Sequence, residues 1–270
     1  MTFRDLRYFN LEFVNAGGYI KYLLRLPSLR RLRHLLKKNE ELIRERKHDT
    51  CYVCGLGPSL ADIDLDKLQD LPVDTLVVNY FVRMAGKTRL YPTYYMMADA
   101  GFVSSKHRAG LEMAIEKFPE SRFIWNSSFP TIDKTVMDYP CRKYFMAMYK
   151  GYYIRPKKID ITKIMPAFGN CICVAIAFAI GVGYKKIVLL GCDFNSFAQQ
   201  HEAHCYDGGS DSKLPRRVAL DQELFSYSFD ATVHLRLAAY ADRMGIEILN
   251  ATRGSLIDAY KRVDVSELYK

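Results

Sequence analysis

The chain has 270 residues, 49% of them hydrophobic, which is enough for one large domain with a sizeable core and excludes disorder over most of its length. It has no apolar run of about 18 residues and no signal-peptide pattern, and its seven cysteines are irregularly spaced, as in proteins of reducing compartments, so we expect a cytoplasmic protein. The net charge is +9, of which +7 falls in residues 1–47, so the remaining chain is nearly neutral and a nucleic-acid partner is not expected.

The N-terminal segment is expected to form a basic amphipathic helix. Leucines recur at spacings of three and four within residues 19–47, arginines and lysines surround them, and Pro27 begins or breaks the helix. This pattern fits a helix that lies on an anionic membrane surface, or one that packs on the domain or on a second subunit. We therefore divide the chain into a helical segment, 1–47, and a folded domain, 48–270.

From residue 50 onward, short apolar runs alternate with helical stretches. Strands are expected at Cys51–Cys54, Thr75–Val78, Tyr94–Met97, Arg122–Trp125, Ile187–Leu190 and Ile246–Leu249. Helices are expected at Ser59–Leu68, Ser104–Phe118, Asn170–Ile180, Val218–Met244 and Ser255–Tyr260, and loops at Lys150–Pro166 and Asn195–Pro215. This alternation predicts an α/β fold with a Rossmann-like, mostly parallel sheet, helices on both faces and ligands at the carboxyl ends of the strands.

A glycine-rich turn, Gly55-Leu56-Gly57-Pro58-Ser59, directly follows the first expected strand. Its glycines let the backbone approach an anion, Pro58 fits a first helical turn, and the exposed amides and the Ser59 hydroxyl can hold a phosphate. A nicotinamide cofactor is disfavoured, because Leu60 and Asn79 stand where its fingerprint needs a third glycine and an acid. The turn is expected to bind another nucleotide; the alternative is a tight connection without a ligand.

A second candidate region runs from Phe168 to Phe194. Gly169 and Asn170 start a helix that is apolar on nearly every face and must be buried, and this start is again suited to an anion. The apolar strand that follows delivers Asp193 to the carboxyl edge of the sheet. Its carboxylate is a candidate for orienting a base, binding a ribose or attacking a sugar carbon; the alternative is that it caps a turn.

Histidines supply the candidate bases. His201 and His204 lie in the loop after Asp193, where a neutral imidazole can accept a proton near pH 7, unless both are simply solvated. Their spacing is too weak a pattern for a metal site. His234 is expected to pack within the last long helix, and Asp99, at the end of the third strand, either lines the site or forms a turn.

Two further motifs are weaker indications of a functional site. Cys51-x-x-Cys54 spans a strand, so its side chains point to opposite faces and redox or zinc use is not expected. The basic aromatic stretch Tyr149–Lys158 either binds an acidic glycan or forms a solvated loop.

The order of these motifs resembles a known family. Gly-x-Gly-Pro-Ser-Leu, then Val78-Asn79-Tyr80-Phe81, then the alanine-rich helix with Gly-Tyr-Lys-Lys-Ile and Leu-Gly-Cys-Asp-Phe, is similar to the bacterial sialyltransferases of glycosyltransferase family 42. It is also similar to the related proteins grouped as domain of unknown function 115. The resemblance spans residues 50–260 in motif order, with a long unmatched middle, and leaves residues 1–47 outside.

The resemblance implies a CMP-sugar donor at the carboxyl ends of a Rossmann-like sheet, without a metal or other cofactor. Gly55, Gly57, Pro58 and Ser59 would approach the donor phosphate, Asn79 the nucleoside, and Phe168, Gly169 and Asn170 the sugar or phosphate of the donor. The family has a histidine base shortly before the last long helix, and the matching stretch Phe225–Asp230 has none. A base is therefore sought at His201 or His204.

The predicted function is a metal-independent, by default inverting, glycosyltransferase. It would move sialic acid, a related nonulosonate or Kdo from a CMP-sugar to a bacterial surface glycan or glycolipid at the inner face of the cell membrane, with homo-oligomers left open. One alternative is a pyrophosphokinase, for which Asp62, Asp64 and Asp66 would have to hold Mg²⁺. The other is a nucleotide-binding, membrane-docked module without turnover.

Overall fold

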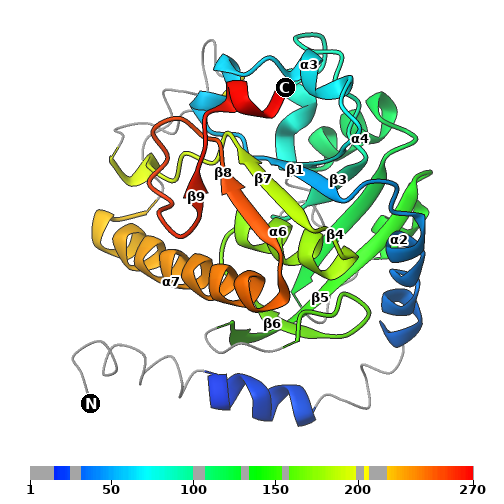
Figure 1. Ribbon diagram of the computed structural model, residues 1–270. Helices are drawn as coiled ribbons and strands as arrows, with labels where there is room; N and C mark the ends of the chain where they lie inside the picture. Colours follow the sequence, from blue (N-terminus) through cyan, green and yellow to red (C-terminus); the bar gives the residue numbers. More distant parts are fainter. Residues whose placement is uncertain are drawn as a thin grey trace.

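A nine-stranded sheet organises the computed structural model of the protein, which describes residues 15–24, 32–99, 107–128, 134–153, 158–198, 204–206 and 218–269. The strand order is β6-β5-β4-β3-β2-β1-β7-β8-β9, and every neighbouring pair is parallel (Figure 1). The strands are β1 (Thr50–Cys54), β2 (Asp74–Val78), β3 (Tyr94–Met97), β4 (Arg122–Ser128), β5 (Arg142–Tyr152), β6 (Met165–Ala167), β7 (Lys186–Leu190), β8 (Glu247–Asn250) and β9 (Lys261–Arg262). The predicted α/β class with a mostly parallel sheet is confirmed.

Helices cover both faces of this sheet and divide the core into two layers. The layer on one face contains α6 (Cys171–Val182) and α7 (Leu220–Met244); the other contains η1 (Pro58–Asp62), α3 (Leu65–Gln69), η2 (Asn79–Met84) and α4 (Arg108–Lys117). Successive β1 residues alternate between the layers, as the pleat requires, so Cys51 and Cys54 lie on opposite faces as predicted. All seven cysteines are free thiols.

The six strands predicted from apolar runs are all present, and three further strands escape prediction. The expected loop at Lys150–Pro166 is wrong at both ends, because β5 extends to Tyr152 and β6 begins at Met165. β5 starts with charged residues, so its sequence does not resemble that of a buried strand. In the fold, Arg142 donates to the Glu45 carboxylate of α2 (Glu40–Glu45) at 2.7 Å.

Two predicted helices differ from the structure. The helix expected at Ser59–Leu68 is divided into η1 and α3. The helix expected at Ser255–Tyr260 is wrong, because this segment instead fastens the loop after β7: the Ser255 hydroxyl donates to the Cys192 carbonyl (2.7 Å) and the Leu256 N–H to the Asp193 carbonyl (2.9 Å). The remaining elements are α5 (Lys134–Asp138), η5 (Ser196–Ala198) and η7 (Val265–Tyr269).

The N-terminal segment is helical at residues 15–24, 32–37 and in α2, and Pro27 lies outside the described residues. Leu36 and Leu42 are buried in the core, and the buried Asn39 amide donates to the carbonyls of Phe145 (2.8 Å) and Ile161 (2.6 Å). Residues of the stretch 32–45, which the predicted division assigns to the helical segment, therefore pack against the same core as the sheet. Within the described ranges, none of the helices has the length and apolar content to cross a bilayer.

Candidate functional site

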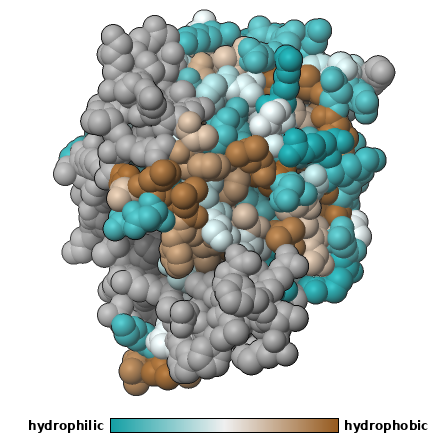
Figure 2. Space-filling model, turned by 90° about the vertical axis from the view of Figure 1, so that its left-hand side faces the viewer, coloured by the Kyte–Doolittle hydropathy of each residue, from teal (hydrophilic) through white to brown (hydrophobic). Residues whose placement is uncertain are grey.

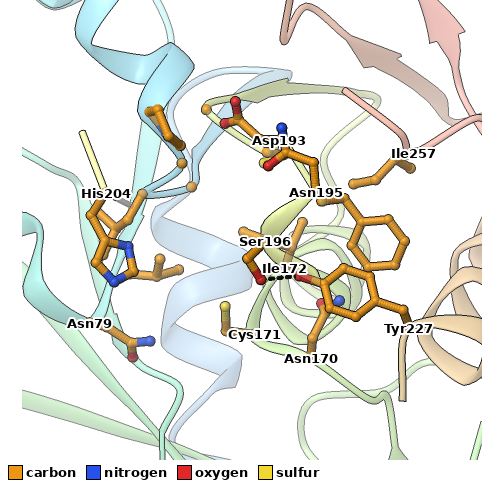
Figure 3. Close-up of a pocket in the computed structure, with 18 residues that line it drawn as sticks. Asn79, Asn170, Cys171, Ile172, Asp193, Asn195, Ser196, His204, Tyr227 and Ile257 are labelled. Atoms are coloured by element: carbon orange, nitrogen blue, oxygen red, sulfur yellow. Dashed lines mark hydrogen bonds between the residues drawn. The ribbon is translucent and has the colours of Figure 1, made fainter. Parts of the chain in front are cut away.

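The order of the strands reverses between β1 and β7. From β1 the sheet grows through β2 to β6 on one side, and from β7 through β9 on the other, so the loops after these two central strands diverge and leave a crevice at their carboxyl ends. A cavity of about 260 Å³ lies there (Figure 3). It is lined by Gly55, Leu56, Gly57, Pro58, Val78, Asn79, Asn170, Cys171, Ile172, Gly191, Cys192, Asp193, Phe194, Asn195, Ser196, His204, Tyr227 and Ile257.

The glycine-rich turn after β1 packs closely against the end of β7. The Gly55 N–H donates to the Leu190 carbonyl (2.8 Å) and the Gly57 N–H to the Gly191 carbonyl (2.9 Å). A Cβ atom on Gly55 would lie 2.4 Å from the Gly191 carbonyl oxygen, which is far inside van der Waals contact. Glycine is thus required here by the approach of two strand ends, and both glycine amides are already hydrogen-bonded within the protein.

Asp193, which follows β7, binds the start of η1. Its Oδ2 accepts from the Ser59 hydroxyl (2.8 Å) and its Oδ1 from the Ser59 N–H (3.3 Å). A Cβ on Gly57 would lie 1.8 Å from Asp193 Oδ2, so the glycine also makes room for this carboxylate. The buried Asp193 carboxylate therefore occupies the position expected for an anionic ligand, and of the roles considered for it, the capping of a turn is the one whose contacts are present.

Asn79 follows β2 and is held in a fixed orientation. It has a φ of 46°, in the left-handed region, and its side-chain Oδ1 accepts from the N–H groups of Ala98 (3.0 Å) and Asp99 (3.2 Å). The Nδ2 group is left on the cavity side, where Figure 3 shows it pointing inward. Asn79 therefore offers a hydrogen-bond donor, rather than an acceptor, to a ligand.

The start of α6 holds a second carboxylate. Asn170 is the N-cap, with Oδ1 accepting from the Cys173 N–H at 2.9 Å. Asp230 reaches across from α7: a Cβ on Gly169 would lie 2.3 Å from Asp230 Oδ1. Burial raises the pKa of the Asp230 carboxyl to about 6, against hydrogen bonds from the Asn170 side chain and backbone that favour the charged form.

Protein carboxylates thus stand at both positions predicted to attract the ligand's phosphate. The donors that remain on the cavity wall at α6 are the backbone N–H groups of Cys171 and Ile172, since first-turn amides have no carbonyl partner within a helix. These amides, with the positive end of the helix dipole behind them, are the groups best placed for an anion.

His204 is the predicted base that reaches the cavity. Its ring stacks on Tyr206 with centroids 5.1 Å apart, and the neighbouring Cys205 N–H donates to the Leu56 carbonyl (3.0 Å), which ties this segment to the glycine-rich turn. His201 lies outside the described residues. His234 is buried, as predicted, with Nδ1 3.0 Å from the Tyr260 hydroxyl, and burial lowers its pKa to about 3.

Tyr227 is a cavity residue that the sequence did not single out. It lies in the stretch of α7 that lacks a histidine, its hydroxyl shares a hydrogen bond with Ser196, and its ring packs 4.5 Å from that of Phe194 (Figure 3). Phe194 has a φ of 58°, an unusual conformation for a bulky residue. Tyr227 lies in the stretch Phe225–Asp230, where the family has its histidine base, and this position in the sequence could have identified it as a site residue.

Other predicted site residues lie around the cavity rather than on its wall. Phe168 is buried and packs on Tyr153, with ring centroids 4.9 Å apart. Ser59 and Gly169 lie behind the lining, against Asp193 and Asp230.

Two of the three acids considered for Mg²⁺ are engaged elsewhere. Asp64 accepts from the Lys67 N–H as the cap of α3 (3.2 Å), and Asp66 accepts from the Thr88 hydroxyl (2.7 Å). Across the part of the chain that the structure describes, His, Cys, Asp and Glu side chains nowhere gather in threes suited to a metal ion.

Comparison with solved structures identifies a protein of similar fold. No protein-family model and no curated protein matches the chain. Among solved structures, the MAf glycosyltransferase of Magnetospirillum magneticum AMB-1 is similar with a TM-score of 0.53 and 14% identity, over 86% of this chain and 38% of that one. This chain therefore spans well under half the length of that protein.

Two sialyltransferases of Campylobacter jejuni are also similar. CST-II, solved with a trisaccharide acceptor and CMP, has a TM-score of 0.46 and 14% identity, over 79% of this chain and 85% of that one. Cst-I, a monofunctional alpha-2,3-sialyltransferase, has a TM-score of 0.45 and 14% identity, over 79% of each chain. Bacterial sialyltransferases are thus among the similar structures, and the fold is shared with the MAf glycosyltransferase.

Proposed function

We propose that the protein is a glycosyltransferase that moves an acidic sugar from a CMP-sugar to a glycan acceptor. The observation that carries the proposal is the cavity between β1 and β7, where the glycine-rich turn, Asn79, the start of α6 and His204 meet. The fold shared with the MAf glycosyltransferase supports this class. The choice of CMP, and of sialic acid, a related nonulosonate or Kdo as the sugar, rests on the motif resemblance.

The donor phosphate is proposed to bind at the first turn of α6. The Cys171 and Ile172 amides line the cavity, whereas the Ser59 turn and the Asn170 cap already hold Asp193 and Asp230. Asn79 Nδ2 is proposed to donate to the nucleoside, because its oxygen is already fixed by two backbone N–H groups.

His204 is proposed as the general base of an inverting transfer, with His201 as the second candidate from its place in the sequence. The neutral imidazole takes the proton of the acceptor hydroxyl, the acceptor oxygen forms a bond to the anomeric carbon, and the bond from that carbon to CMP breaks. Asp193 is less suited to attack the sugar, since both of its oxygens accept hydrogen bonds from Ser59.

The transfer is proposed to need no metal, and its acceptor to be a bacterial surface glycan or glycolipid. We place the reaction at the inner face of the cell membrane, with residues 1–47 in contact with anionic lipid. The support for this location is the charge of the segment and the apolar side chains that helix 15–24 exposes.

Thermal unfolding with different nucleotides tests the nucleotide class. A ligand that binds only the native state raises the unfolding midpoint by mass action, so CMP should raise it whereas NAD and ATP with Mg²⁺ should not. Stabilisation by ATP with Mg²⁺, and not by CMP, would instead support the pyrophosphokinase.

Histidine variants test the proposed base. His204→Ala should lower turnover roughly 10²- to 10⁴-fold while CMP still raises the midpoint, and His34→Ala, at an exposed position of helix 32–37, should keep full activity. Full turnover in both variants would remove His204 from the mechanism.

A further inference from the structure

A second cavity, of about 510 Å³, lies at the amino end of β6, between the N-terminal helices and the loop before that strand. Its lining comes from helix 15–24 (Tyr22), helix 32–37 (Arg33, Lys37) and the loop (Thr162, Lys163). It has no lining residue in common with the cavity at the carboxyl ends of β1 and β7. It is therefore a separate site, to which the proposed transfer assigns no role.

The charges on this cavity favour an anion. Arg33, Lys37 and Lys163 face a single lining acid, Glu40. Arg33 and Lys37 are one helical turn apart and exposed, and neither has an acidic partner among the described residues, whereas Lys163 pairs with Asp160 at 3.2 Å. Two cations without an acidic partner in the described part of the chain lie beside a third, Lys163, and the Tyr22 ring forms a wall. This arrangement suits a phosphate group held by several donors.

Helix 15–24 borders the same cavity and exposes an apolar face. The helix is fastened to β5: the Asn15 side-chain amide donates to the Tyr152 carbonyl (3.0 Å), and Tyr22 stacks on Tyr149 with centroids 5.4 Å apart. Away from these contacts, Ile20 is 57% exposed and Leu24 77%, with the exposed Leu23 beside them. Tyr19 is partly exposed next to them and also contacts the Tyr149 ring, with centroids 6.2 Å apart. The helix lies at the bottom of Figure 1, and hydrophobic side chains are visible at the bottom of Figure 2.

We infer that this region binds the surface of an anionic membrane, with the phosphate headgroup of a phospholipid in the cationic cavity and the apolar face of helix 15–24 in the acyl boundary. Apolar burial and attraction to anionic headgroups add, and either one alone gives weak attachment. The basic charge of residues 1–47 complements such a surface. The inference rests on the membrane location given in the proposed function and extends it, because it names the headgroup site and assigns part of the contact to Thr162 and Lys163, which lie outside the N-terminal segment.

Sedimentation of the full-length protein with vesicles tests the charge component. The wild type should bind phosphatidylcholine vesicles that contain phosphatidylglycerol, and bind pure phosphatidylcholine vesicles much more weakly. Lys163→Glu should weaken binding to the anionic vesicles roughly tenfold or more. The matched control is Lys117→Glu, an equal charge change at an exposed residue of α4, far from helix 15–24 in Figure 1, and it should bind like the wild type.

A second pair of variants tests the apolar component. Leu24→Ser should lower vesicle affinity roughly tenfold, since a leucine side chain no longer enters the lipid. Met113→Ser, at a position on α4 that is 49% exposed, is the control and should leave binding unchanged.

Three outcomes would overturn the inference. The first is a wild type that does not sediment with anionic vesicles, and the second is equal binding by Lys163→Glu and Lys117→Glu. The third is thermal stabilisation by inorganic phosphate that Lys163→Glu abolishes, without any vesicle binding, which would assign the cavity to a soluble anion. All measurements omit donor and acceptor, so they stand or fall separately from the transferase proposal, and Lys163→Glu should still be stabilised by CMP.

Discussion

Replacing Asp230 by Asn should change how the stability of the protein depends on pH. Burial raises the pKa of this carboxyl to about 6, from an ordinary value of 3.8. Between these two values the folded state holds a proton that the unfolded state has released, so in the wild type this group makes folding more favourable as the pH falls from about 7 to about 4. The amide side chain that the substitution introduces cannot titrate, and the variant loses this dependence.

The size of the effect follows from the two pKa values. A gap from 3.8 to about 6 corresponds to about 3 kcal/mol, at about 1.4 kcal/mol per pKa unit. The free energy of unfolding of Asp230→Asn minus that of the wild type should therefore rise by up to about 3 kcal/mol between pH 4 and pH 8. Static differences between the two side chains, such as altered hydrogen bonds to Asn170, shift this difference equally at every pH.

Urea unfolding of both proteins across this pH range measures the difference. His234, whose pKa burial lowers, has the opposite effect on stability, because the unfolded state alone gains its proton below about pH 6.5, but it is present in both proteins and cancels. Asp242→Asn, the same chemical change at an exposed position of the same helix, is the matched control. A difference for Asp230→Asn that stays constant with pH, or rises toward acid, would refute the reasoning.

Three further substitutions test packing around the site. Gly57→Ala should destabilise the protein by about 3 kcal/mol in urea unfolding, because its Cβ would lie 1.8 Å from Asp193 Oδ2, and adding Asp193→Ala should recover part of the loss; an unchanged midpoint for Gly57→Ala would contradict this contact. Leu42→Ala should cost about 2–5 kcal/mol and the exposed neighbour Ile43→Ala far less, whereas equal small losses would mean that α2 is not part of the core. Asn170→Ala should cost about 1 kcal/mol through the lost N-cap, and Asn170→Ser should restore most of it.

Much of the fold can be predicted from the sequence because the central strands are buried on both faces. Such strands are short continuous apolar runs, and each expected run forms a strand of the sheet. β5 escapes prediction because its first two residues are charged, and the carboxylate that pairs with Arg142, Glu45 of α2, lies 97 residues away from it in the sequence. The expected helix at Ser255–Tyr260 fails for a related reason, since its backbone is used by the loop after β7.

At the candidate site, too, the residues next to predicted strands could be placed from the sequence, whereas contacts between distant residues could not. Residues that directly follow strands, such as Gly57, Asn79 and Asp193, could be placed at the carboxyl edge from chain order alone. Their partners could not, because the Ser59–Asp193 contact joins residues 134 positions apart, and Asp230 meets Asn170 only once α7 has packed on α6. An anion site predicted from a helix start can therefore be judged only in the folded structure, which here places the carboxylates of Asp193 and Asp230 at the two predicted positions.

The ends of the sheet have a consequence for solubility. A long exposed edge strand offers unpaired N–H and C=O groups to the edge of another chain and so promotes aggregation. The outermost strands of this sheet are short. β6 has three residues with a proline in the middle, and β9 has two residues, which are both charged. Such short edges offer an incoming strand few hydrogen bonds, so the sheet does not readily grow by the addition of further molecules. This protection matters because parallel sheets fold slowly and are exposed to aggregation while they fold.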